Sequence, residues 1–366
     1  MNKSIFIFVF LCCFQNSYAQ NVIQDFLALQ SIPKTYAVLK TTEALKIDGK
    51  DDEKSWSKAK TISNFEDIQG GDFKKPTYKT EVKMLWDSTY LYIYAKLYEP
   101  HIWGDIDKHD EIIYHNNDFE IFLKPNLQQA EYYEIEVNPL NTIFDLMLPK
   151  PYRFGGQAIT HWDVKNLKSA VYINGSLNSP HDIDSFWSVE FAIPHQSLYA
   201  FGKSPMPKKD DYWLCNFSRV QWQHAINNDH YSRKKENNKI LPEDNWVWSP
   251  IGLVNMHYPE RWGYLQFVEQ SQEQEPALPA SYAVTKLAWN IHYLQQLFKK
   301  ENRRYSDQLA KLSLYNQYLL PALKDFQVTL DLNKDKQSYS MKIIDKQSKK
   351  IQVSLDSRGN LIFTSN

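Results

Sequence analysis

Cysteine and glycine are scarce in this chain, and neither sign of charge dominates it. Its 366 residues include 3 cysteines and 11 glycines, and 42 lysines and arginines stand against 43 aspartates and glutamates. The formal net charge of −1 provides no positive field that could hold a nucleic acid backbone, so we expect no nucleic acid partner. So few cysteines exclude a small scaffold held by disulfides, and the fold must be stabilised by burial of a hydrophobic core.

Long hydrophobic runs are also missing. The apolar stretch Ile5–Phe14 has about ten residues where a membrane-spanning helix needs about 20, and no other stretch is long enough, so we expect no membrane span. Lys3 precedes this stretch and Ser17-Tyr18-Ala19 follows it, which is the charged, apolar and small-residue order of a secretory signal peptide. The sequence therefore predicts a signal peptide over residues 1–19, cleavage after Ala19 and a secreted or periplasmic protein.

The cysteines bear on this interpretation. Cys12 and Cys13 lie inside the predicted signal peptide, so cleavage leaves Cys215 without a partner in the chain. A lipid anchor at Cys12 is the weaker alternative, because Val9-Phe10-Leu11 precedes it where small residues would be needed.

Aromatic residues, by contrast, are abundant. The chain has 11 tryptophans, 23 tyrosines and 19 phenylalanines, so some rings must face something other than the core. Trp56, Trp86, Trp187 and Trp213 lie on or beside alternating stretches and are expected in the core.

Between residues 45 and 269 the sequence predicts short strands separated by Asp, Asn, Gly and Pro. In the stretch 91–98, every second residue from Leu91 to Leu97 is apolar, and the residues between them are tyrosines and a lysine. This alternation is typical of a half-buried antiparallel strand. Strands about ten residues apart with turns between them indicate two packed sheets.

The composition changes on both sides of this region. Residues 20–44 form an N-terminal lead, and the polar residues 270–280 are typical of a linker. Beyond it, 281–366 shows apolar residues at helical spacing over 284–298 and 305–319, and then alternating runs. The expected C-terminal segment is a helix pair with a small β-meander, and a protein partner could contact it.

Several short strings occur together in the predicted sandwich, and their order and spacing resemble the carbohydrate-binding module family 9-like domains, a group of DOMON-like β-sandwiches. The strings are Ile47-Asp48-Gly49-Lys50 through Trp56, Leu85-Trp86-Asp87 before Leu91-Tyr92-Ile93, Asp118-Phe119-Glu120-Ile121-Phe122, Trp187-Ser188-Val189-Glu190 before Ile193-Pro194, Asn216-Phe217-Ser218-Arg219, Trp248-Ser249-Pro250, and His257-Tyr258-Pro259-Glu260-Arg261-Trp262-Gly263. The resemblance spans about 225 residues and leaves out the C-terminal segment.

The resemblance implies a mainly β fold, a jelly-roll-like antiparallel β-sandwich with an aromatic slot for a sugar, and in some members structural calcium. One slot wall in the family is a tryptophan six residues before the strand glutamate, and here these positions are Tyr114 and Glu120. The second tryptophan of the slot is replaced by Met256, His257 and Tyr258.

A sugar ring has an apolar face and a rim of hydroxyl groups, so its site needs aromatic platforms and polar partners. We expect Trp103 and Tyr114 as platforms, although each could be a ring folded over the edge of the core. Glu120 is the expected rim partner; the alternative is a solvated strand carboxylate. The other candidates are Arg219, Trp248, His257 and Arg261, and both arginines could instead form internal ion pairs.

Enzymatic and cofactor alternatives stay open. Carboxylates at suitable separation could hydrolyse O-glycosyl bonds, but no motif assigns an acid and a nucleophile to Glu120, Glu134, Glu136 or Glu190. Haem could be held by Met256 and His257 with Met84 or His101, and a transition metal by a loop with His101, His109 and His115.

Calcium is the cofactor that export favours. The acidic turn with Asp48, Asp51 and Asp52 is the weak candidate for a structural calcium site, with a solvated turn as the alternative. The sequence as a whole predicts an exported, non-catalytic protein of carbohydrate catabolism that binds an oligo- or polysaccharide.

Overall fold

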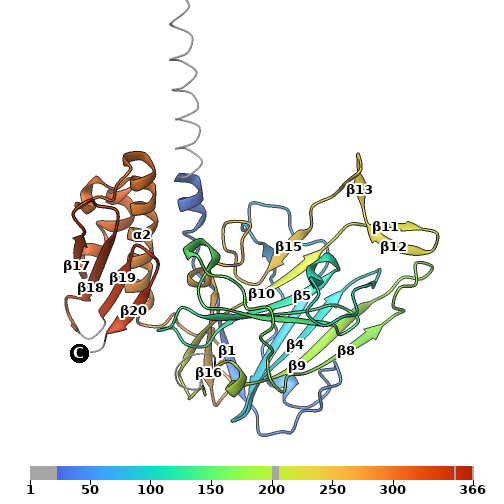
Figure 1. Ribbon diagram of the computed structural model, residues 1–366. Helices are drawn as coiled ribbons and strands as arrows, with labels where there is room; N and C mark the ends of the chain where they lie inside the picture. The colour runs from blue at the N-terminus through green and yellow to red at the C-terminus, as the bar shows by residue number, and fades with distance from the viewer. Residues whose placement is uncertain (1–22, 200–205, 350–351, 365–366) are drawn as a thin grey trace, which may run out of the picture. The chain divides into compact units, whose positions relative to one another are not determined.

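The computed structural model describes residues 23–199, 206–349 and 352–364, which form two compact units (Figure 1). One unit is residues 32–278, and the other combines residues up to Ser31 with 279 onward. The predicted signal peptide, its cleavage site, Cys12 and Cys13 lie outside the described residues. Within the described part of the chain, no helix is long and apolar enough to span a bilayer.

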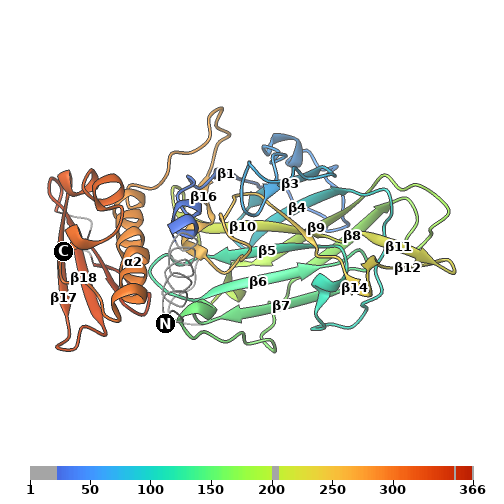
Figure 2. The same cartoon turned by 90° about the horizontal axis from the view of Figure 1, so that it is seen from above.

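Unit 32–278 is built on one twelve-stranded sheet. The order along the main path of the sheet is β7-β6-β5-β10-β16-β1-β3-β4-β9-β8, and Figure 2 shows these strands side by side. Strand β15 pairs with β10, and β2 pairs with β15. The strands are β1 (Thr35–Lys40), β2 (Glu66–Asp67), β3 (Thr80–Trp86), β4 (Tyr90–Tyr98), β5 (Asp118–Lys124), β6 (Tyr132–Val137), β7 (Ile143–Leu148), β8 (Lys168–Asn174), β9 (Phe186–Pro194), β10 (Tyr212–Gln221), β15 (Asp244–Val247) and β16 (Gly263–Val268).

Short elements connect these strands. They are the 3₁₀ turns η1 (Trp56–Lys58), η2 (Ile113–His115), η3 (Tyr152–Phe154), η4 (His195–Ser197) and η5 (Pro259–Arg261), and the paired strands β11 (His224–Asn227), β12 (His230–Arg233), β13 (Lys235–Glu236) and β14 (Lys239–Ile240).

Strand β1 joins the two halves of the sheet, because it pairs in parallel with β16 on one side and β3 on the other. This strand lies within residues 20–44, the predicted N-terminal lead. The compact unit begins at Ile32 and therefore includes part of that lead. The halves face each other across one core, which contains Phe119 and Ile121 of β5 as well as Ile93 of β4 and Phe191 of β9. The mainly β, sandwich-like fold is thereby confirmed.

Both faces of strand β4 are buried, although its alternating sequence predicts that only one face is. Its Leu91 and Ile93 face the main core as predicted. Its Tyr92 and Tyr94 are buried too, because the segment with Leu45 and Trp56 packs over them. Both faces of this strand are therefore covered.

Glu190 of β9 holds that covering segment in place. Its carboxylate accepts hydrogen bonds from the backbone N–H groups of Asp48 (2.9 Å) and Gly49 (3.2 Å) and from Trp56 Nε1 (3.3 Å). Gly49 has a φ of 82°, and a Cβ atom there would come within 2.6 Å of the Tyr172 nitrogen, so only glycine fits. The hydrogen bonds of Glu190 thus have a structural role, and the turn at Asp48 and Gly49 depends on them.

The second unit has a core of its own around α2 (Tyr282–Asn302). The four-stranded meander β17 (Phe326–Leu332), β18 (Tyr339–Asp345), β19 (Gln352–Asp356) and β20 (Leu361–Thr364) packs on it together with Phe26. The predicted second helix over 305–319 is broken into short helical segments, the 3₁₀ turn η6 (Leu309–Lys311) and the π-helical turn η7 (Tyr315–Leu319), and the 3₁₀ turn η8 (Ala322–Lys324) follows. Leu314 has a φ of 58°, and this left-handed residue interrupts the helix.

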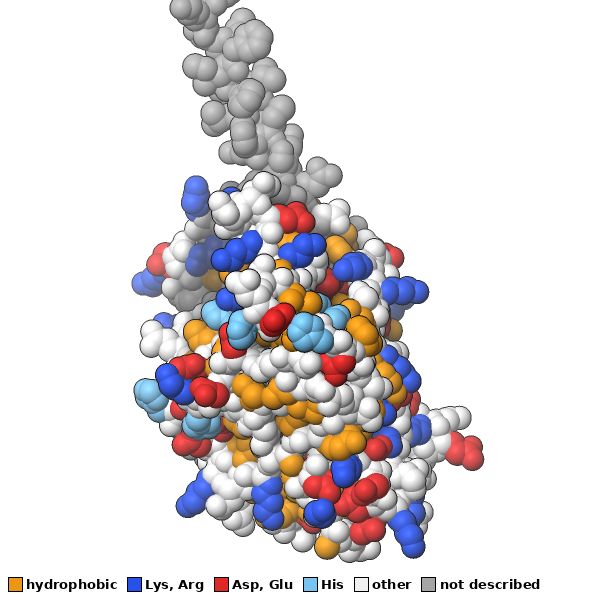
Figure 3. Space-filling model, turned by 90° about the vertical axis from the view of Figure 1, so that its right-hand side faces the viewer, with side chains coloured by type: hydrophobic (Ala, Val, Ile, Leu, Met, Phe, Trp, Pro, Cys, Tyr) orange, Lys and Arg blue, Asp and Glu red, His pale blue; other side chains and the backbone are white. Residues whose placement is uncertain are grey.

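The surface mixes charges of both signs. Figure 3 shows basic and acidic side chains across the same face, with hydrophobic side chains and several histidines between them. This distribution agrees with the formal net charge of −1.

Candidate functional site

A cavity of about 650 Å³ lies over the face of β5, β6 and β7 that points away from the core. This volume falls within the range of roughly 300–1,000 Å³ that is common for small-molecule sites. Five acidic residues line it, and no lysine or arginine does so among the residues that the structure describes. The lining includes Asp110, Tyr114, Glu120, Phe122, Glu134, Glu136, Phe144, Tyr152, Glu243, Asn245, Met256 and His257.

The floor is made by paired residues of neighbouring strands. Glu120 of β5 lies opposite Glu136 of β6, and Phe122 lies opposite Glu134. Residues opposite each other in an antiparallel pair project from the same face of the sheet. Because Phe119 and Ile121 point into the core, this register turns the three glutamates into the cavity.

The carboxylates of the floor are buried and close together. Oxygen atoms of Asp118, Glu120 and Glu136 lie within 4.8 Å of one another, and each residue is at most 7% exposed. Burial raises the pKa of Glu120 to about 7 and raises the pKa values of Asp118, Glu134 and Glu136 well above their usual range, with the charge of Glu120 adding to the effect on the other three. At neutral pH the floor therefore holds protons, and it offers both hydrogen-bond donors and acceptors to hydroxyl groups.

Tyr114 forms one wall, and its backbone is fixed from behind. It lies on η2, directly before β5, and its ring is 38% exposed. The indole nitrogen of buried Trp222 donates a hydrogen bond to the Tyr114 carbonyl at 2.7 Å. Asn116 Oδ1 accepts hydrogen bonds from the backbone N–H groups of Asp105 (3.0 Å) and Ile106 (3.2 Å), which fixes the rest of the loop.

Tyr152 and His257 form the wall at the other end of the cavity. The Tyr152 ring on η3 is 45% exposed and meets the His257 ring edge-on, with 4.6 Å between centroids. His257 Nδ1 lies 2.9 Å from the Tyr132 hydroxyl, and Arg153 donates a hydrogen bond to the His257 carbonyl. Burial, with a further effect of the Arg153 charge, lowers the pKa of His257 to about 4, so this imidazole is neutral at pH 7.

Two exposed aromatic rings above a buried polar floor are what a saccharide site requires, and the sequence match agrees. Residues 47–145 match a family model described as carbohydrate family 9 binding domain-like. The chain contains a carbohydrate family 9 binding domain-like region. This confirms the resemblance noted from the sequence and supports a carbohydrate-binding role.

The chain is also similar to several solved structures. A candidate carbohydrate-binding protein from Bacteroides uniformis ATCC 8492 is 15% identical, with a TM-score of 0.45 over 64% of this chain and 100% of that chain. A family 9 carbohydrate-binding module from Caldicellulosiruptor kristjanssonii, solved with cellotriose and with glucose, is 16% identical, with a TM-score of 0.40 over 66% of this chain and 100% of that chain. No curated protein matches the sequence.

Three predicted site residues come together in the cavity beside the family 9-like strands. Tyr114, Glu120 and His257 all line it. Glu134 and Glu136, which were expected only as possible catalytic carboxylates, lie in the same floor. Tyr152 was not predicted. The only sequence signal for it is its place between Pro151 and Gly155 in a turn after β7, which marks an irregular and exposed segment.

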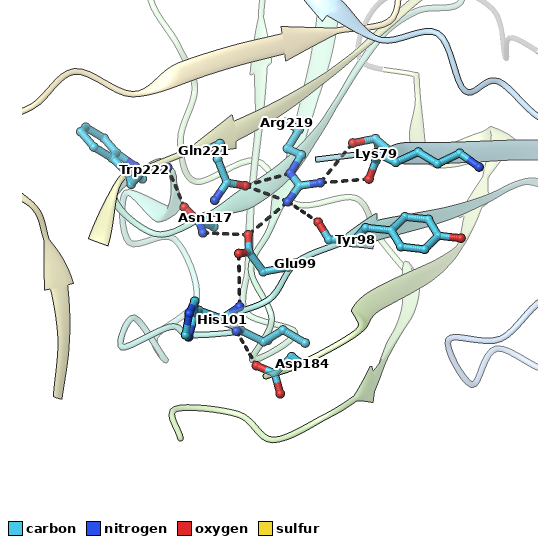
Figure 4. A network of polar contacts seen from close by, with 11 residues as sticks. Lys79, Tyr98, Glu99, His101, Asn117, Asp184, Arg219, Gln221 and Trp222 are labelled. Atoms are coloured by element: carbon cyan, nitrogen blue, oxygen red, sulfur yellow. Dashed lines mark hydrogen bonds and ion pairs between the residues drawn. The ribbon is translucent and has the colours of Figure 1, made fainter. Parts of the chain in front are cut away.

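Arg219 does not face a ligand, which corrects its expected role as a rim partner. It is 1% exposed on the inner face of β10, two residues after the core residue Phe217. Its guanidinium group donates to Glu99 Oε2 (3.1 Å), Gln221 Oε1 (2.7 Å) and the carbonyl oxygens of Lys79 (3.2 Å) and Tyr98 (2.9 Å) (Figure 4). These contacts join β10 to the ends of β3 and β4, so Arg219 closes one end of the sandwich.

Three further candidates are buried away from the cavity, and their expected roles are corrected too. Trp103 is 3% exposed and packs with Val220 and Trp222, because the loop after β4 folds back over the sheet. Trp248 is 2% exposed and belongs to the main core. Arg261 is 5% exposed on η5 and does not belong to the cavity lining that the described residues form.

Several of the predicted metal and haem ligands have other partners among the described residues. Asp48 pairs with Lys46 at 2.9 Å and Asp51 with Lys83 at 2.5 Å, so two members of the proposed calcium turn have lysine partners, while Asp52 joins neither acidic group that could hold a metal ion in the described residues. Met84 is fully buried in the core. His101 Nδ1 is hydrogen-bonded to the Tyr231 hydroxyl, whereas the His115 ring lies tilted beside the Tyr114 ring.

Proposed function

We propose that this chain is an exported saccharide-binding protein that holds its ligand in the cavity above β5 and β6. Tyr114 and Tyr152 stack on the C–H faces of the sugar, and Glu120, Glu134 and Glu136 bind its hydroxyl groups. The observation that carries the proposal is the combination of exposed rings and buried carboxyl groups around one cavity of about 650 Å³. Stacking supplies affinity, and the polar floor selects the orientation of the hydroxyl groups.

The charge of the cavity narrows the ligand class. Five acidic residues line it and no lysine or arginine does so among the described residues, so it offers no cationic partner to the uronate or sulfate groups of an acidic saccharide. A neutral saccharide can use the protonated carboxyl groups as donors and the ionised ones as acceptors. We therefore expect neutral oligo- or polysaccharides as ligands.

Calorimetric titration tests the proposal directly. Glucose and cellotriose, which the Caldicellulosiruptor kristjanssonii module contains in its structures, are the first probes, and a glycan array extends the panel. We expect Tyr114→Ala and Tyr152→Ala to weaken binding at least tenfold each, which is about 1.4 kcal/mol. Trp103→Phe is the matched control, because it alters a buried ring outside the cavity. Undiminished binding by both tyrosine variants would refute the assignment of the site.

Hydrolysis of O-glycosyl bonds is the second candidate function, and one observation favours it. Glu120 and Glu136 have oxygens within 4.8 Å of each other, and the pKa of Glu120 is raised to about 7, as is common for a general acid. Incubation with the oligosaccharide that binds best, followed by measurement of new reducing ends, distinguishes the two functions. Product formation that Glu120→Gln abolishes would make the protein an enzyme.

Export and the role of the second unit complete the proposal. If the chain is exported, the mature protein begins at Gln20, which mass spectrometry of the extracellular or periplasmic fraction would reveal. In a saccharide-degrading system, the unit around α2 would contact a protein partner while the sandwich binds sugar. A structural calcium at Asp48, Asp51 and Asp52 stays a prediction.

A further inference from the structure

A second group of polar side chains surrounds the edge strand β7. It consists of His109 and Asp110 from the loop before η2, Asp145 from the middle of β7, and Asp163 from the loop before β8. One ligand atom from each of the four residues lies within 4.8 Å of the others. The group thus brings together three segments that are far apart in the sequence.

Asp145 is the unusual member of this group. It lies opposite Ile135 in register and therefore on the core side of the sheet, and it is 2% exposed. One of its carboxylate oxygens accepts a hydrogen bond from the Val164 N–H group. The other, Oδ1, has no hydrogen-bond partner among the described residues and lies 3.8 Å from His109 Nε2. A buried carboxylate oxygen in this position is stabilised either by a proton or by a cation.

The spacing of the four ligand atoms is the second observation. His109 Nε2 lies 3.0 Å from Asp163 Oδ1, 3.5 Å from Asp110 Oδ1 and 3.8 Å from Asp145 Oδ1. Zinc binds nitrogen and carboxylate oxygen at about 2.1 Å in a tetrahedron, so neighbouring ligand atoms are about 3.4 Å apart. The three observed separations lie on both sides of this value.

We propose that His109, Asp110, Asp145 and Asp163 form a binding site for a divalent transition-metal cation, with zinc as the best fit. An imidazole nitrogen among the donors favours zinc over calcium and magnesium, which prefer oxygen ligands alone. Three carboxylates supply the negative charge, and no lysine or arginine is paired with any of them in the part of the chain that the structure describes. His109 and Asp163 are 55% and 63% exposed in their side chains, which gives the ion a path to the site.

The site has a structural consequence. An ion held there would tie the loop before η2 and the loop before β8 to the edge of the sheet. Asp110 also lines the saccharide cavity, so the metal would fix one rim of that cavity. Metal binding does not depend on the proposed saccharide function, and either can fail without the other.

Titration of the purified, untagged and chelator-treated protein with Zn²⁺ tests the site, with Mn²⁺ and Ca²⁺ as comparison ions and no saccharide present. We expect one equivalent of Zn²⁺ to bind, Ca²⁺ to bind more weakly, and His109→Ala to weaken Zn²⁺ binding at least tenfold. Asp145→Asn should have the same effect, and the half-exposed His109→Ala covers the case in which that buried variant fails to fold. His181→Ala is the matched control, because His181 is exposed and pairs with the single carboxylate of Asp229 at 3.4 Å.

X-ray absorption at the zinc edge supplies an independent measurement. Bound zinc should show one nitrogen and three oxygen neighbours from the protein at about 2.0–2.2 Å. Absence of stoichiometric Zn²⁺ binding would overturn the proposal and leave His109 as a protonated ion-pair partner of the aspartates. Equal Zn²⁺ binding by wild type and His109→Ala would overturn it as well.

Discussion

Replacing Glu120 by glutamine should remove one contribution to the pH dependence of the free energy of unfolding. The pKa of Glu120 is raised from 4.5 to about 7 in the folded chain because burial disfavours the charged form. The folded state therefore binds more protons than the unfolded state between these two pH values. Stability contributed through Glu120 falls as the pH rises from 4.5 to 7, and the full loss is present above pH 7.

The size of this effect follows from the two pKa values. Linkage gives a loss of about 2.5 kcal/mol for Glu120 between pH 5 and pH 8. His257 works in the opposite direction, since its pKa is lowered from 6.5 to about 4. Stability contributed through His257 is present above pH 6.5 and lost as the pH falls through 4, which amounts to about 2 kcal/mol between pH 8 and pH 5. The two effects oppose each other, and the raised pKa values of Asp118, Glu134, Glu136 and Glu190 act in the same direction as that of Glu120.

Glutamine keeps the shape of Glu120 but cannot ionise, so the variant should lose the Glu120 contribution and keep those of the other buried groups. We compare the free energy of unfolding of Glu120→Gln with that of the wild type at each pH. This difference should favour the variant by about 2.5 kcal/mol more at pH 8 than at pH 5. For a unit of this size, the difference corresponds to about 5–10 °C in Tm. Tryptophan fluorescence suits the measurement, because every tryptophan except Trp289 lies in unit 32–278.

Urea unfolding followed by fluorescence at pH 5 and pH 8 gives the required free energies. Glu236→Gln, which removes the same charge from an exposed position on β13, is the control and should follow the wild type. If Glu120→Gln has the same pH dependence as the wild type, the carboxyl group is not held in its protonated form, and our description of the cavity floor is wrong.

Three further predictions concern other buried groups. Arg219→Met should lower the free energy of unfolding by about 3–5 kcal/mol, because Glu99 is left as a buried charge without its partner. Denaturant unfolding measures this loss, and adding Glu99→Gln to the variant should restore part of it. The His257 imidazole should titrate in NMR spectra near pH 4, and a value near 6.5 would contradict its burial. The Cys215 thiol is fully buried with a raised pKa, so a thiol reagent should modify it only after unfolding, and fast reaction of the folded chain would show that β10 opens.

Much of the sandwich could be predicted because its strands carry a period of two. The alternation in β4 and the core tryptophans Trp56, Trp86, Trp187 and Trp213 are found as expected. Strand β1 was not predicted, since its six residues pair in parallel with partners far along the chain, and no local turn marks such pairing. The second C-terminal helix was predicted from apolar spacing, which does not register the left-handed backbone at Leu314.

The candidate site was only partly predictable for a related reason. The same alternation places Arg219 on the core side, two residues after Phe217, so its parity argued against a ligand contact. Glu120 lies between two core residues and was correctly placed on the outer face. Its burial could not be predicted, because the loops that cover this face come from residues near 114, 152, 243 and 257. Which loops meet over a sheet depends on tertiary structure.

The contrast between Arg219 and the cavity floor indicates which buried charges serve stability. The guanidinium group of Arg219 has a hydrogen-bond acceptor for each of its nitrogens, as a charge within a structural network requires. Both oxygens of Asp118 and one oxygen of Glu136 lack any partner among the described residues, although both side chains are buried. Hydrophobic residues at these positions would make the sheet more stable. Glu136 also lines the open cavity, and the saccharide that we propose there would supply the missing partner of its carboxyl oxygen.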